Sequence, residues 1–146
     1  MTLSDSFYGV YRGQSAMPLP AETISYLEAD YLEACTVYDY ETGSYVPVYD
    51  SEAVKGPDPY GMFLAGSKSL LRIENPAAPE GKRLILFRDS FGSSIAPLLA
   101  GGYREVVLVD IRYISPALLG QFLSFEDRDV LFLYSESVLN NSETLK

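Results

Sequence analysis

The chain has 146 residues, 47% hydrophobic and 21% charged, a balance that predicts one globular domain with a sizeable core rather than a disordered chain. Its net charge is −9 and its Lys and Arg residues are scattered, which excludes a nucleic-acid backbone as the expected partner. Histidine is absent, so these 146 residues cannot contain a Ser-His-Asp triad, a His-ligated metal or a histidine base.

The first half of the sequence predicts short and irregular elements, because residues 1–80 are rich in Tyr, Pro and Gly. Apolar residues at helical spacing predict a helix over residues 22–34. The stretch VYDYETGSYVPVYD has strand-type residues on both sides of a turn sequence, which predicts a β-hairpin. Pro47 would place the second strand of this hairpin at the edge of a sheet.

The second half predicts regularly alternating strands and helices. The expected elements are strands at 83–89, 105–114 and 129–134, helices at 93–100 and 116–123, and a helical tail near 136. This order is typical of βαβ units, and the nearly continuous apolar strands indicate an α/β protein whose parallel sheet is covered on both faces. We expect one domain over 1–146, with an irregular and hairpin region at 1–80 and a βαβαβ core at 83–137.

Cofactors and location are constrained mainly by what the sequence lacks. Cys35 is the single cysteine, so neither a disulfide within the chain nor a thiolate metal cluster is expected, and we predict no metal and no cofactor. The apolar runs are too short to span a bilayer. The first ten residues lack the basic start and apolar stretch of a signal peptide, so the residues leave the location open.

The candidate nucleophile is Ser90, within LILFRDSFGSSIAPLLAGG. A serine at the carboxyl end of a buried strand, entering a helix, would expose its Oγ where ligands bind in open α/β sheets. Gly92 would allow a substrate to approach the backbone closely. It matches the second glycine of the G-x-S-x-G nucleophile elbow of α/β-hydrolases, whereas Arg88 stands at the position of the first glycine. The alternative is that Ser90, Ser93 or Ser94 caps the helix.

Charged and small residues at the same sheet edge complete the candidate site. Arg112, two residues after Asp110, would bind an anionic group or orient Asp89; the alternative is a structural ion pair with either aspartate. The turn at Gly66 and Ser67 would supply a second oxyanion donor, or it is a plain turn.

Four stretches of the chain resemble the DHHW family of bacterial SGNH-hydrolase-like proteins. They are FYG near the start, DPYGMFLAGSKSLLRIENP, LILFRDSFGSSIAPLLAGGYREVVLVDIRYI and DVLFLYSES. The resemblance is to the C-terminal half of the family. It implies a flavodoxin-like three-layer SGNH fold, with Ser90 as nucleophile and the Gly66-Ser67 turn near the oxyanion hole. Relatives have Gly-Asn at that turn, and Ser67 departs from this.

The same resemblance implies a function and an incomplete catalytic set. The family is related to proteins that O-acetylate polysaccharides, which implies a serine esterase or O-acyltransferase acting on cell-surface carbohydrate, outside the cytoplasm. The Asp and His of the family lie upstream of the serine, so we expect this chain to be part of such a protein and inactive alone. The competing hypothesis is a non-catalytic module that binds a glycan or protein through its tyrosine-rich face, or forms a homo-oligomer.

Overall fold

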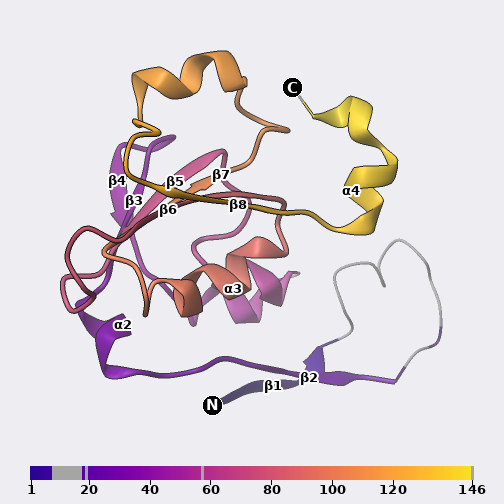
Figure 1. The fold of residues 1–146 in the computed structure, drawn as a ribbon. Helices are drawn as coiled ribbons and strands as arrows, with labels where there is room; N and C mark the ends of the chain where they lie inside the picture. Colours follow the sequence, from indigo (N-terminus) through magenta and orange to yellow (C-terminus); the bar gives the residue numbers. More distant parts are fainter. Residues whose placement is uncertain (8–17, 19, 57, 146) are drawn as a thin grey trace.

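The computed structural model describes residues 1–7, 18, 20–56 and 58–145 and has a six-stranded mixed sheet at its centre (Figure 1). The strand order is β4-β3-β5-β7-β6-β8. The strands are β3 (Thr36–Asp39), β4 (Ser44–Val46), β5 (Leu70–Glu74), β6 (Arg83–Arg88), β7 (Glu105–Val109) and β8 (Asp129–Leu133). The predicted α/β class is confirmed.

The prediction of a parallel sheet is wrong for half of the strands. β7, β6 and β8 run parallel, whereas β5 pairs antiparallel with β7 and β3 pairs antiparallel with β5 and β4. Parallel neighbours need a long crossover, which only the second half of the chain supplies. β3 and β4 are joined by a tight turn that reverses the chain direction, so the predicted hairpin is present, with β4 at the sheet edge as Pro47 indicates.

Helical segments lie on both faces of the sheet (Figure 1). α3 (Gly92–Leu99) connects β6 to β7, and Ala96 belongs to the apolar cluster on its face of the sheet. The 3-10 helix η3 (Pro116–Gln121) connects β7 to β8, and Leu119 belongs to the cluster on the opposite face. Period-2 alternation along β6 sends Leu84 and Leu86 to the first cluster and Ile85 and Phe87 to the second.

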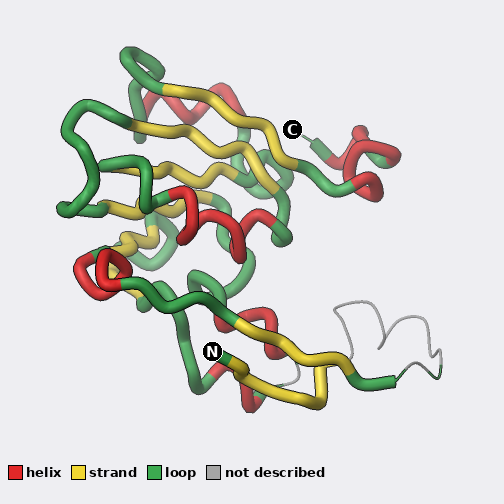
Figure 2. The backbone as a smooth tube through the Cα atoms, turned by 60° about the horizontal axis from the view of Figure 1, so that its bottom comes forward, coloured by secondary structure: helices red, strands yellow, loops and turns green. Residues whose placement is uncertain are grey.

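The N-terminal part forms a separate two-stranded sheet, which Figure 2 shows apart from the main sheet. β1 (Thr2–Phe7) pairs antiparallel with β2 (Glu22–Ser25), and α2 (Asp30–Ala34) follows. The predicted helix over 22–34 is therefore wrong in its first part, because residues 22–25 gain backbone partners in β1 that sequence periodicity does not reveal.

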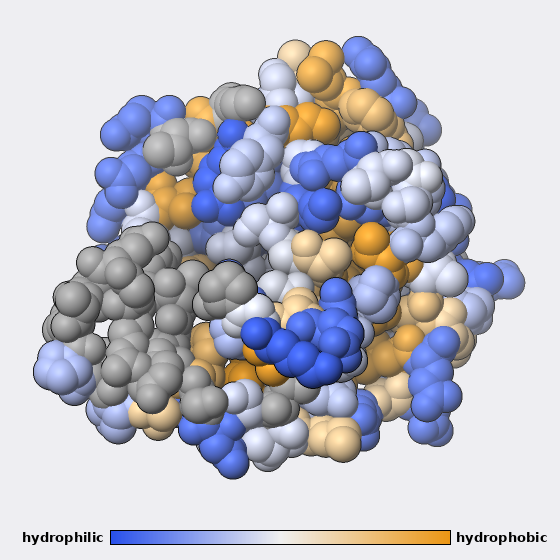
Figure 3. All heavy atoms as spheres, turned by 180° about the vertical axis from the view of Figure 1, so that it is seen from behind, coloured by the Kyte–Doolittle hydropathy of each residue, from blue (hydrophilic) through white to orange (hydrophobic). Residues whose placement is uncertain are grey.

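The remaining helical segments are short. They are η1 (Ala53–Lys55), η2 (Pro59–Met62), α4 (Glu136–Asn140) and η4 (Ser142–Thr144). Among the described residues, no helix has the length and apolar character needed to cross a bilayer. Seen from the side opposite to Figure 1, the surface is hydrophilic over much of its area, with hydrophobic residues emerging in separate groups (Figure 3).

Candidate functional site

Ser90 lies in the turn between β6 and α3, at the carboxyl ends of the parallel strands. It is half-buried and borders a pocket of about 350 Å³. The pocket is lined by Asp89, Ser90, Phe91, Arg112, Ser135, Ser137, Val138 and Asn141. Within the described part of the chain, the Ser90 Oγ forms no hydrogen bond, so the hydroxyl is available to a ligand or a base.

Asp89 fixes the shape of this turn through its carboxylate. The side chain is 1% exposed. The N–H of Phe91 donates to its Oδ1 (3.0 Å), and the N–H of Ser135 donates to its Oδ2 (2.7 Å). Ser135 follows β8, so one carboxylate ties the ends of two neighbouring parallel strands together and positions Ser90 beside them.

The side chains of Ser90, Ser93 and Ser94, which were the predicted caps, do not cap α3. The N-cap is Phe91, which makes no side-chain cap hydrogen bond. The Oγ of Ser93 is buried without a partner in the described residues, and the Oγ of Ser94 lies 2.8 Å from the hydroxyl oxygen of Tyr60. The N–H of Phe91 instead donates to Asp89, so the aspartate before Ser90 provides the side-chain acceptor at the start of the helix.

A charge cluster of Arg88, Asp110 and Arg112 lies at the carboxyl ends of β6 and β7. Arg88 is fully buried, and its guanidinium lies 3.7 Å from the carboxylate of Asp110. Burial lowers the pKa of Arg88, an effect that the Asp110 carboxylate partly opposes. Arg112 donates to both Asp110 oxygens (2.9 and 2.6 Å), and these bonds raise the pKa of Arg112. The structural ion pair is therefore formed, with Asp110, while Arg112 also lines the pocket beside Ser90.

Gly92 has a packing role that its place in the sequence did not suggest. A Cβ at this position would lie 2.6 Å from the Cβ of Arg88 and 3.0 Å from its Cγ, well inside van der Waals contact. A glycine here lets α3 begin directly against the buried Arg88 side chain. Substrate approach at Gly92 stays a prediction.

The Gly66-Ser67 turn lies outside the lining of the Ser90 pocket. Residues 64–66 are all in the left-handed region, with φ of +85° at Gly66. The N–H of Gly66 donates to the carbonyl of Phe63 (3.0 Å) and is therefore engaged. The oxyanion role of Gly66 and Ser67 stays a prediction, and it would require the Gly66 N–H to leave Phe63.

The segment after β8 contributes to this pocket, and no residue of it was predicted from the sequence as part of the site. Ser137 of α4 lines the pocket, together with Ser135 just before the helix and Asn141 just after it. The available signal was the stretch SES at the end of the third parallel strand, because the carboxyl ends of parallel strands meet at one edge. Tyr60 was also missed: its hydroxyl lies 2.9 Å from the Phe91 carbonyl oxygen, to which it donates, holding η2 against the Ser90 turn.

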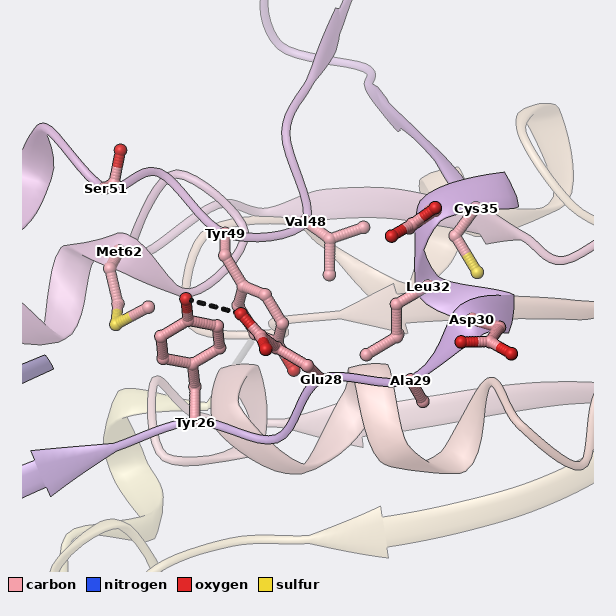
Figure 4. A pocket seen from close by; sticks show the side chains of 11 residues that line it. Tyr26, Glu28, Ala29, Asp30, Leu32, Cys35, Val48, Tyr49, Ser51 and Met62 are labelled. Carbon is pink, nitrogen blue, oxygen red and sulfur yellow. Dashed lines mark hydrogen bonds between the residues drawn. The ribbon is translucent and has the colours of Figure 1, made fainter. Parts of the chain in front are cut away.

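A second pocket, of about 630 Å³, lies at the tyrosine-rich N-terminal part (Figure 4). The rings of Tyr26 and Tyr49 meet there with centroids 5.0 Å apart, and the Tyr26 hydroxyl donates to Glu28 (3.1 Å). Burial raises the pKa of Tyr49 to about 12. Ser90 is not among the lining residues, so the tyrosine-rich surface and the candidate nucleophile belong to different pockets.

Three solved structures are similar to this chain in fold. Bacillus cereus PatB1 with a sulfonyl adduct has a TM-score of 0.60 and 22% identity, over 82% of this chain and 43% of that one. A second structure of Bacillus cereus PatB1 gives 0.60 and 23%, over 84% and 43%. A DHHW family protein from Eubacterium siraeum DSM 15702 gives 0.55 and 20%, over 86% and 45%.

These likenesses establish a shared fold. This chain spans less than half the length of each of these neighbours. No family model and no curated protein matches its sequence.

Proposed function

We propose that this chain is a DHHW family protein that carries the nucleophile of an SGNH-like serine esterase or O-acyltransferase acting on acylated cell-surface carbohydrate. The observation that carries this proposal is the Ser90 hydroxyl, unbonded within the described residues, at the mouth of a pocket beyond the carboxyl ends of β6 and β8. The choice of carbohydrate as the substrate rests on the sequence resemblance.

The arrangement of the parallel strands supports a flavodoxin-like core. β7, β6 and β8 are parallel, with the first strand of the three in the middle and helical connections on opposite faces. Ligands of such sheets bind where the connections diverge to the two faces, which is the end of β6. A fold neighbour, Bacillus cereus PatB1, carries a sulfonyl adduct, and sulfonyl reagents modify nucleophiles, which favours a reactive side chain within this fold.

In the proposed reaction, the Ser90 Oγ attacks an ester carbonyl carbon, the bond from that carbon to the sugar oxygen breaks, and the acyl group stays on Ser90 until water or an acceptor hydroxyl removes it. The Ser90 proton must pass to a base and then to the leaving sugar oxygen, and because the 146 residues contain no histidine, an imidazole base would have to come from outside this chain. The Ser90 N–H donates to none of the described acceptors and would stabilise the oxyanion. Arg112, which lines the same pocket, would bind the carbonyl or an anionic group of the substrate.

Imidazole added in solution tests this proposal, because it replaces the missing base. The chain is incubated with an aryl acetate over increasing imidazole concentrations, and acetylated serines are located by peptide mass spectrometry. We expect acetylation of Ser90 that rises with the free-base concentration. Ser137→Ala, which alters another serine of the pocket, is the matched control and should leave this acetylation unchanged.

The results that would contradict the proposal are equally specific. Acetyl groups spread evenly over Ser135, Ser137 and surface lysines would show that Ser90 has no special reactivity. The same pattern in Ser90→Ala as in the unchanged chain would lead to the same conclusion. An aromatic sulfonyl fluoride gives an independent measurement, since it should modify Ser90 and spare the Ser90→Ala variant.

A non-catalytic role in binding protein is the second candidate. The observation that favours it is the apolar edge of β8, where Val130, Leu131 and Phe132 are exposed.

A further inference from the structure

β8 is an edge strand with the side chains of a central strand. It pairs with β6 on one side, and no described strand pairs with its other side (Figure 2). Val130, Leu131 and Phe132 are 45%, 39% and 64% exposed. Register with β6 sends Val130 and Phe132 to one face and Leu131 to the other, so apolar side chains are exposed on both faces. Strands of this composition are normally buried on both faces.

The opposite edge of the sheet is protected in the way that edge strands usually are. β4 has three residues, begins with Ser44 and is followed at once by Pro47, which has no N–H to donate. β8 has five residues, and DVLFL contains neither proline nor lysine. Among the residues that the structure describes, the unprotected hydrogen-bonding edge of the sheet is therefore at β8.

We propose that β8 of a second copy of this chain pairs antiparallel with β8, with the two-fold axis at Leu131. In this register Leu131 lies opposite Leu131 of the second copy, Val130 lies opposite Phe132, and Asp129 lies opposite Leu133. The two sheets join into one, and the contact is isologous, so it closes as a dimer. This inference is independent of any catalytic role of Ser90.

The charges near β8 are compatible with self-pairing. Arg128 pairs with Glu105 of its own chain, and Asp129 accepts from the Tyr103 hydroxyl at 2.9 Å. In the proposed register no like charges face each other across the two strands. The net charge of −9 on each copy opposes association at long range, and salt screens that repulsion.

The apolar area at β8 is sufficient for a modest interface. Phe125 lies 6.5 Å from Phe87 in a stacked arrangement, and Phe87 also stacks with Phe132 at 4.7 Å, which extends the patch beyond the strand. With side-chain areas of about 150–250 Å² for aromatic residues, the exposed parts of Val130, Leu131, Phe132 and Phe125 amount to roughly 400 Å² per copy. Two copies, together with the strand backbone, approach the ~1,200 Å² at which specific interfaces begin. A dimer of moderate affinity is expected.

Sedimentation velocity over a range of protein and salt concentrations tests this proposal. The unchanged chain should sediment as a dimer that dissociates on dilution, and added salt should shift the equilibrium toward the dimer. Leu131→Lys would place two like charges directly opposite each other at the axis and should give a monomer. Tyr45→Lys is the matched control: Tyr45 is 65% exposed on β4, at the other sheet edge, and its change should leave the dimer intact.

A cysteine cross-link gives a readout that does not depend on disrupting the strand. Opposed residues in antiparallel strands have Cα atoms about 4.5–5.5 Å apart, within disulfide reach. In a Cys35→Ala background, mild oxidation should link Leu131→Cys into a covalent dimer and leave Tyr45→Cys unlinked.

The proposal is overturned by a chain that stays monomeric at every concentration and salt, or by a dimer that survives Leu131→Lys and does not cross-link at 131. Failure of these tests would leave the acetylation of Ser90 unaffected.

Discussion

A methyl group added at Gly92 should destabilise the protein, although alanine is normally the better helix residue. The new Cβ would lie 2.6, 3.0 and 3.3 Å from the Cβ, Cγ and Cδ of Arg88. Carbon atoms in contact prefer about 3.5–4.0 Å, so α3 and β6 would have to separate locally by about 1 Å. Arg88 cannot yield easily, because it is fully buried and its guanidinium donates to the carbonyls of Asp89 and Lys68 at 3.3 Å each.

The expected magnitude follows from two opposed effects. Overpacking of a close-packed interior costs about 1–3 kcal/mol and occasionally more. Replacement of glycine by alanine gains about 1 kcal/mol inside a helix, and this is an upper bound for Gly92 because it is the first residue of α3. Because the new Cβ makes three close contacts with a buried side chain, we expect Gly92→Ala to lower the free energy of unfolding by about 1–2 kcal/mol. Each kcal/mol corresponds to a fall of about 2–4 °C in Tm.

Urea denaturation followed by circular dichroism measures this change, and Gly120→Ala is its control. Gly120 lies in the helical segment η3, and no atom lies within 4 Å of a Cβ built there. Gly120→Ala should therefore leave the free energy of unfolding unchanged or raise it by up to about 1 kcal/mol. Equal effects of the two substitutions would refute the steric argument. Because α3 begins at Gly92, its displacement should also reduce imidazole-dependent acetylation at Ser90 relative to Gly120→Ala.

Three further predictions concern the residues around the site. Asp110→Asn should lower the free energy of unfolding by about 3–5 kcal/mol, because it leaves the buried Arg88 without its counter-charge at 3.7 Å. If urea denaturation gives a loss below about 1 kcal/mol, Asp110 is not needed to neutralise Arg88. Tyr60→Phe keeps the ring but loses the hydroxyl contacts to the Phe91 carbonyl and the Ser94 Oγ, and should cost about 1 kcal/mol, with Tyr45→Phe on the exposed edge as a silent control. Burial raises the pKa of Tyr134 from 10.0 to about 12. The neutral phenol therefore contributes to stability below pH 10, and this contribution is lost as the pH rises from 10 to 12. Tyr134→Phe should remove that part of the alkaline loss of stability, and a profile of stability against pH that does not change would refute the prediction.

The chain order of elements in the second half could be predicted from the sequence. β6, α3, β8 and the start of α4 lie close to their expected positions, because apolar runs of strand length and nearby turn residues are local signals. The strand predicted over 105–114 begins as expected but ends at Val109, where the chain enters a turn. Pro116 begins η3 as predicted, although the segment is a 3-10 helix rather than an α-helix.

The arrangement of the sheet could not be read in the same way. β5 has no predicted counterpart, yet it lies between β3 and β7 and makes half of the sheet antiparallel. Strand neighbours and direction depend on pairings between distant segments, such as Leu71 with Leu108. Hydrophobic pattern alone does not distinguish these alternatives.

The sequence by itself determined that Ser90 follows a buried strand and that the chain contains no imidazole to activate it. Both are properties of residue order and composition. Only the tertiary structure decided that Asp89 is held by the N–H of Ser135, 46 residues away, and that Arg88 is fully buried against Gly92. These contacts form because the carboxyl ends of β6 and β8 meet at one sheet edge, and buried polar groups must then find partners among whichever residues the fold brings there.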